Sequence, residues 1–157
     1  MRSVLITAFA GAALMASLGV PAQAPPAAAP AAPASALPRT PSAPGAEVYL
    51  ISPQDGARVH NPVRVQFGLK GMGVAPAGVV FPNTGHHHLL IDVDAPADLG
   101  APLPANEHVV HFGKGQTETT LTLSPGTHTL QLLFADANHV PHAPPLVSAK
   151  VTVTVLP

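Results

Sequence analysis

The chain has 157 residues, no cysteine, no tryptophan and a formal net charge of −1 with histidine counted as neutral. These properties allow one modest domain, exclude disulfides, thiolate metal sites and cysteine nucleophiles, and provide no basic surface for nucleic acid. Histidine is in excess, with 9 residues against 7 Lys+Arg and 8 Asp+Glu. Because histidine is the commonest metal ligand as well as a pH switch, the excess favours metal binding; compositional drift is the simpler alternative.

The N-terminus has the pattern of an export signal. Arg2 precedes an apolar run from Val4 to Val20, and Ala22-Gln23-Ala24 follows as a small-residue cleavage pattern. We therefore expect residues 1–24 to be a signal peptide, with cleavage after Ala22 or Ala24, and the protein to be periplasmic or secreted without a remaining membrane span. Because the apolar run is close to the length of a membrane helix, an uncleaved anchor is the alternative.

Proline and alanine dominate the next segment. Residues 21–45 hold 8 of the chain's 20 prolines, so we expect residues 25–46 to be a disordered, extended linker. The remaining residues, 47–157, contain all eight acidic side chains and five of the seven basic ones. This balance weakly favours cations over anions as ligands of the domain.

The domain has the pattern of short β-strands separated by Gly- and Pro-rich turns. In one of them, Val63, Val65, Phe67 and Leu69 alternate with Arg64, Gln66, Gly68 and Lys70, which is typical of a strand with one buried face. The predicted strands are residues 47–52, 62–70, 86–93, 107–112, 117–123, 127–135 and 146–155. Seven strands without a helical period predict an all-β fold, an immunoglobulin-like antiparallel β-sandwich of about seven strands.

The immunoglobulin strand order predicts where the histidines lie. It puts the first, second, fourth and fifth strands in one sheet and the other three in the second sheet, so that three loops share one pole. That pole would carry Met72, His86, His87, His88, His111, Lys114, Asp136, Asn138, His139 and His142. His60 would be a solvated loop residue, and His128, at the opposite pole, a hydrogen-bonded structural histidine.

Strand alternation divides the histidine triplet. His86 and His88 would share the outer face as a two-nitrogen chelate, and His87 would turn to the rim of the core. His111, next to a turn, is a better candidate than His108, which faces the opposite way. The predicted metal ligands are His86, His88, His111, His139, His142 and Met72, the last of which is otherwise a core residue. Asp136, Asn138 and His87 are predicted to support them.

Five segments of the domain resemble a family of small exported bacterial proteins catalogued as domain of unknown function 4399. They are Ser52 to Ala57, Lys70 to Gly78, Gly85 to Asp92, His111 to Glu118 and Asn138 to His142. The resemblance covers about residues 47–155 and implies a compact exported β domain. It implies no activity, since the family is uncharacterised. The family pattern also includes His128, which the predicted topology puts far from the other histidines.

The ligand set decides which metals are expected. A cysteine-free set of imidazoles in an exported protein suits copper first and zinc second. We therefore expect an exported His-rich metal-binding protein, a copper carrier or buffer rather than an enzyme, because the chain lacks G-x-S-x-G and P-loop motifs. Metal-dependent chemistry at the histidines is a minor alternative. The second alternative function is an interaction or structural module of the envelope. Such a module would bind another envelope protein, and its histidines would be structural or pH-sensing. Carbohydrate is not expected as a partner, since aromatic residues are few.

Overall fold

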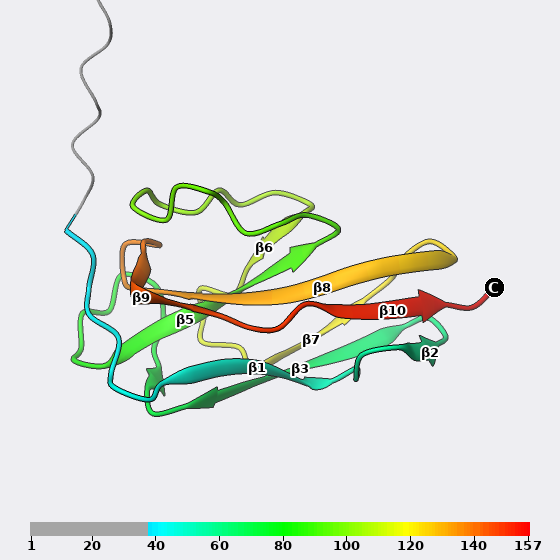
Figure 1. Ribbon diagram of the computed structural model, residues 1–157, viewed down its shortest axis with the longest axis horizontal. Helices are drawn as coiled ribbons and strands as arrows, with labels where there is room; N and C mark the ends of the chain where they lie inside the picture. Colours follow the sequence, from blue (N-terminus) through cyan, green and yellow to red (C-terminus); the bar gives the residue numbers. More distant parts are fainter. Residues whose placement is uncertain (1–37) are drawn as a thin grey trace, which may run out of the picture. The chain divides into compact units, whose positions relative to one another are not determined.

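The computed structural model of the protein describes residues 38–157 (Figure 1). The predicted signal peptide and most of the predicted linker lie outside these residues. The described chain contains ten β-strands and no helix, and so no helix with the length and hydropathy needed to cross a membrane. The strands are β1 (Glu47–Ser52), β2 (Ala57–Val59), β3 (Val63–Lys70), β4 (Gly73–Val74), β5 (Thr84–Ile91), β6 (Val109–His111), β7 (Glu118–Leu121), β8 (Gly126–Ala135), β9 (Pro141–Val147) and β10 (Val151–Val155).

The strands form two sheets. One has three strands in the order β1-β3-β7, and the other has the order β2-β10-β8-β5-β4, with β6 paired to β5 and β9 paired to β8. All pairings are antiparallel except β10 with β2 and β4 with β5. In Figure 1, β1 and β3 lie below β8 and β10 as two layers. The predicted antiparallel β-sandwich is confirmed.

The core lies between the sheets and follows the alternation of the sequence. Val63, Val65 and Phe67 project from β3, while Leu130, Leu132 and Phe134 project from β8, and all six are buried in one cluster. The polar partners in the alternation, such as Arg64 on β3, are exposed. Burial of alternate residues in both sheets is therefore what joins the two layers.

One predicted strand lies in the wrong sheet. Residues 107–112 were expected beside the first, second and fifth strands, but β6 pairs with β5 in the other sheet, and β7 occupies the edge of β3. The cause is the long connection between β5 and β6, in which Leu103 packs on Leu133 of β8. This packing returns the chain to the open edge of β5, where the Ile91 N–H donates to the His108 carbonyl oxygen at 2.8 Å.

Other strand boundaries differ less. The predicted last strand, residues 146–155, is interrupted by Ser148 to Lys150 and divides between β9 and β10. The short strands β2 and β4 were not predicted, since three and two residues leave no period to recognise. The end of the predicted linker is also part of the domain: Pro41 forms a parallel bridge with Ala143 at the start of β9.

Candidate metal centre

The histidine triplet occupies the middle of β5, where alternation sends its members to opposite faces. Gly85, His87, Leu89 and Ile91 face the core, and His86, His88 and Leu90 face outward. His86 and His88 have ring centres 4.8 Å apart. The two imidazoles therefore form the first half of a site on the outer face of the sheet.

The third imidazole comes from β6. Because β6 pairs with β5, His111 lies opposite His88 in the register. The centre of its ring is 5.1 Å from that of His88 and 4.9 Å from that of His86. Gly113 makes room for this ring, since a Cβ atom there would lie 2.2 Å from His111 Cε1.

The fourth imidazole comes from the turn after β8. His139 adopts a positive φ of 66°, and its N–H donates to the Asp136 carbonyl oxygen at 3.0 Å. The Asp136 N–H donates to the Val140 carbonyl oxygen, also at 3.0 Å, which closes the turn. The centre of the His139 ring lies 5.0 Å from that of His86 and 4.7 Å from that of His111.

The four rings surround one point. Five of the six distances between ring centres lie between 4.7 and 5.1 Å, and the sixth, from His88 to His139, is 6.1 Å. With metal–nitrogen bonds of about 2.0–2.1 Å, and ring centres about 1.1 Å beyond each nitrogen, four tetrahedral imidazoles would have centres about 5.2 Å apart. The group of His86, His88, His111 and His139, here called the four-histidine cluster, has this spacing.

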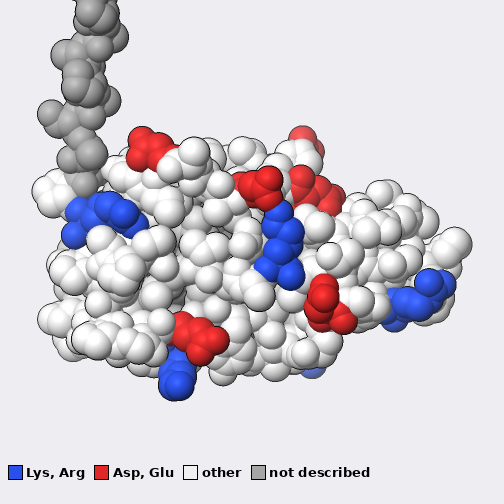
Figure 2. Space-filling model, viewed as in Figure 1, with Lys and Arg blue, Asp and Glu red and all other residues white. Residues whose placement is uncertain are grey.

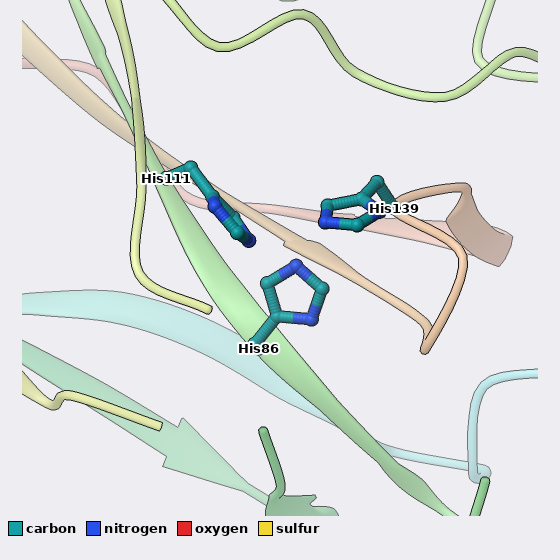
Figure 3. Close-up of side chains that lie close together, drawn as sticks. All are labelled: His86, His111 and His139. Carbon is teal, nitrogen blue, oxygen red and sulfur yellow. The ribbon is translucent and has the colours of Figure 1, made fainter. Parts of the chain in front are cut away.

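Three of the rings already present nitrogens to one another. Ring nitrogens of His86, His111 and His139 lie within 4.8 Å of one another, and Figure 3 shows the three side chains pointing toward a shared centre. A tetrahedral metal needs these nitrogens about 3.3–3.4 Å apart. Rotations of the rings would bring the nitrogens to this shorter separation.

Two imidazoles of the cluster are buried more completely than is usual for polar side chains. His86 and His88 have no exposed surface, and neither ring has a hydrogen-bond partner among residues 38–157. Burial, reinforced by the neighbouring histidines, lowers the pKa of His86 to about 4 and that of His88 to about 3, and burial lowers the pKa of His111 as well. These rings are therefore neutral at pH 7, as a metal ligand must be.

A loop covers the outer face, which was predicted to be open to solvent. In the β5–β6 connection, Leu103 forms a second apolar cluster with Leu133 and Ala135, joined by Ala95 and Leu99. The Leu103 N–H also donates to the His139 carbonyl oxygen at 2.9 Å. This loop, seen above β8 in Figure 1, turns a surface chelate into an enclosed site.

His87 lies on the other side of the sheet. Its ring is fully buried, with its centre 5.2 Å from that of Phe67 and 5.1 Å from that of Phe134. Burial lowers the pKa of His87 to about 4. His87 thus belongs to the hydrophobic core, as alternation predicted, rather than to the four-histidine cluster.

His142 and Met72 are also separate from the cluster, although both were predicted as ligands. Ala135 pairs with Pro141 on one face, so His142, the next residue along β9, turns to the core face and stacks on Phe134 with ring centres 5.7 Å apart. Met72 packs, partly buried, against the main core. Neither side chain faces His86 and His88.

Asp136 acts on the backbone of the His139 turn, whereas Asn138 takes part only through its N–H group. Asp136 Oδ1 accepts hydrogen bonds from the N–H groups of Asn138, at 2.8 Å, and Val140, at 3.0 Å. The Asn138 side chain is exposed. Asp136 was predicted to orient an imidazole directly; its hydrogen bonds instead fix the main chain that carries one.

A second polar group lies at the far end of β8. His128 Nδ1 contacts Asp92 Oδ2 at 2.7 Å, and its Nε2 lies 2.9 Å from the Ser124 carbonyl oxygen and 3.4 Å from the Ser124 hydroxyl. Both ring nitrogens thus face acceptors, which suits a doubly protonated ring and leaves no free base to activate the serine. The hydrogen bond to Asp92 raises the pKa of His128 accordingly.

Some parts of the site had no recognisable sequence signal. The contact of Asp92 with His128 joins residues 36 positions apart, and the covering leucines of the β5–β6 loop resemble ordinary loop residues. Only Gly113 offered a hint, since a glycine two positions after a candidate ligand suggests close approach of the ring to the backbone.

The fold and the cluster define an all-β protein with four imidazoles gathered on one sheet face, two of them fully buried. A family model described as "Domain of unknown function (DUF4399)" matches residues 65–156, and the chain belongs to this family. The matched range contains all four histidines of the cluster. No curated protein and no solved structure matches the chain.

Proposed function

We propose that the protein is an exported metal-binding protein that carries or buffers copper, with zinc as the alternative metal. The observation that carries the proposal is the convergence on one point of four imidazoles, of which His86 and His88 are fully buried and have no hydrogen-bond partner in the described chain. Unpaired buried polar groups cost about 1–3 kcal/mol each, and a bound cation would use their lone pairs.

The spacing of the rings bears on the choice of metal. Imidazole nitrogens favour Cu(II) over Zn(II) in the Irving–Williams order, whereas a regular tetrahedron favours zinc. A square-planar set would have two ring-centre distances of about 6.4 Å and four of about 4.5 Å. One distance, 6.1 Å from His88 to His139, is close to the longer square-planar value, whereas the opposite distance, 4.9 Å from His86 to His111, is close to the tetrahedral one, so the choice of metal rests on the Irving–Williams order. We therefore put copper first.

The number of ligands supports a carrier or buffer rather than an enzyme. Catalytic metal sites keep a coordination position open for water or substrate, whereas four protein ligands complete a four-coordinate site. Export is supported by the apolar N-terminal run and by a ligand set without thiols. On the face seen in Figure 2, charged side chains are scattered rather than gathered by sign, so this face offers no basic track for nucleic acid.

The test is a titration of the purified chain with Cu(II) and with Zn(II) against a chelator of known affinity. We expect one ion per chain, and loss of the site when His86→Ala and His88→Ala are combined. His60→Ala combined with His108→Ala, which removes two exposed histidines outside the cluster, is the matched control. Binding no tighter than micromolar for both metals, or binding unchanged by the first pair, would overturn the proposal.

The alternative, an interaction module of the envelope, is favoured by one surface feature. Val79, Val80 and Phe81 form an apolar loop tip with 47%, 87% and 68% of their surfaces exposed. If this tip carries the function, Val80→Ser with Phe81→Ser abolishes a protein complex detected by cross-linking, while the chain purified from its host contains no stoichiometric metal.

A further inference from the structure

The segment that precedes the sandwich contacts the turn that carries His139. The Arg39 Nε–H donates to the Pro141 carbonyl oxygen at 3.0 Å, and Arg39 Nη2 donates to the His142 carbonyl oxygen. The Thr40 hydroxyl donates to Asp136 Oδ2 at 2.7 Å. We call residues 39–42 the strap.

Main-chain bonds hold the strap in register with the start of β9. The Ala143 N–H donates to the Thr40 carbonyl oxygen at 2.9 Å, and the Ser42 N–H donates to the Ala143 carbonyl oxygen at 3.1 Å. These bonds place the Thr40 hydroxyl against Asp136, a residue that is 5% exposed. The strap is therefore an added edge of the sandwich, adjoining the four-histidine cluster.

Asp136 links the strap to the cluster. One carboxylate oxygen accepts the Thr40 hydroxyl, and the other accepts the N–H groups on both sides of His139. His139 itself has a positive φ, which is uncommon for a residue other than glycine and persists where surrounding bonds enforce it. Thr40 thus acts on the backbone of His139 through a single carboxylate.

His139 is the member of the cluster whose position depends most on such bonds. His86, His88 and His111 project from paired strands, and their backbones are fixed by sheet hydrogen bonds. His139 lies in a turn between β8 and β9, and its ring is partly exposed. Freeing the turn would leave three imidazoles in place and move the fourth.

From these contacts we propose that the strap is a positioning element of the metal site, with Thr40 setting the affinity contributed by His139 through Asp136. The inference rests on the proposed function. It makes residues 39–42, near the end of the predicted linker, part of the site, so that whatever detaches the strap weakens metal binding and leaves the other three ligands in place. Thr40 is a positioning residue and contacts no metal.

The test is a double-mutant cycle on the full chain. Thr40→Val keeps the shape of the side chain and removes the hydroxyl, and loss of an outer partner of a metal ligand typically lowers affinity about 10–100-fold. We expect an affinity about tenfold lower for Thr40→Val, and no more than about a twofold effect of the same substitution in a His139→Ala background. Ser42→Ala, which removes only the hydroxyl bond to the Pro144 carbonyl oxygen, is the matched control and should bind as the parent does.

A second measurement separates this inference from the proposed function. Amide hydrogen exchange of Asn138 and Val140 in the metal-free protein should be at least tenfold faster in Thr40→Val than in Ser42→Ala. If amide exchange is faster in Thr40→Val but the parent protein binds no metal, the proposed metal function is wrong. The strap would then only stabilise the His139 turn. Equal affinity losses with and without His139, or no loss at all, would overturn the strap's role while leaving the metal site intact.

Discussion

His88 and His111 are direct register partners across β5 and β6, with ring centres 5.1 Å apart. The pair exists because β6 lies in the same sheet as β5. In the expected immunoglobulin arrangement the two residues would occupy opposite sheets, and His111 could approach His88 only from the end of its own strand. The position of β6 beside β5 instead puts both side chains on one face of one sheet, where hydrogen-bonded neighbouring strands hold their backbones.

The first prediction concerns the middle histidine of the triplet. His87→Leu should leave metal affinity within about twofold of the parent, because the ring faces Phe67 and Phe134. It should raise the free energy of unfolding by about 1 kcal/mol, since it removes a buried ring without hydrogen-bond partners in residues 38–157. Metal titration and thermal unfolding check both results. A loss of metal binding would place His87 among the ligands.

The second prediction compares two histidines three residues apart. His139→Ala should lower metal affinity at least tenfold with little change in the melting temperature of the metal-free protein. His142→Ala should do the reverse, because its ring fills space against Phe134 and Gly85 in the core and its loss costs about 1–3 kcal/mol. Parallel titrations and melting curves distinguish the two. Equal metal loss in both variants would contradict the separation seen in the structure.

The third prediction concerns Gly113. An alanine Cβ at this position would lie 2.2 Å from Cε1 and 2.4 Å from Nε2 of His111, so Gly113→Ala must displace the ring. We expect metal affinity to fall about tenfold, as for other changes that misplace a ligand. The effect should vanish in a His111→Ala background, measured in the same titration. If it persists there, the glycine acts through the fold rather than through the ligand.

The fourth prediction concerns acid stability of the metal-free protein. Burial lowers the pKa of His86 and His87 to about 4 and of His88 to about 3, against about 6.5 in the unfolded chain. Between these values the unfolded chain binds protons that the folded chain does not, so stability falls as the pH decreases from about 6.5 to 4. Melting temperatures measured across this range check the sign. His87→Leu should reduce the slope, and an unchanged slope would contradict the assignment.

The fifth prediction concerns His128, for which the pH dependence of stability has the opposite sign. Because its hydrogen bond to Asp92 outweighs burial, the pKa of His128 is raised in the folded state. The resulting stabilisation is fully present below the unfolded pKa of about 6.5 and disappears as the pH rises through the folded value. His128→Gln should therefore destabilise the protein more at pH 5.5 than at pH 9, as measured by denaturant unfolding. A loss that does not depend on pH would indicate packing alone.

Much of the fold could be predicted from local patterns in the sequence. The alternation in Val63 to Lys70 gave β3 to within one residue, and alternation through the histidine triplet assigned His87 to the core face. The turn chemistry of Pro53 to Gly56 and of Ser124 to Gly126 marked strand ends. These features depend on near neighbours in the chain, which is why sequence reveals them.

Contacts between distant residues were not predictable in the same way. The position of β6 depends on how Leu103 packs on Leu133, and the face occupied by His142 depends on the pairing of Ala135 with Pro141. A shift of one residue in that pairing would have sent His142 to the opposite face. The sequence thus predicted all four clustered histidines as candidate ligands, but not the loop that covers them, nor that His142 and Met72 lie apart from them.

The covering loop has a consequence for the speed of exchange. In the proposed function, Leu103 packed on Leu133 blocks the approach of an ion to His88 across the sheet face, and the route lies at the partly exposed His111 and His139. Because His86 and His88 have no exposed surface, an ion would reach them only when the loop or the His139 turn opens. At high ion concentration the uptake rate should level off at that opening frequency, so that residence time reports motion of the protein more than the strength of the metal–nitrogen bonds.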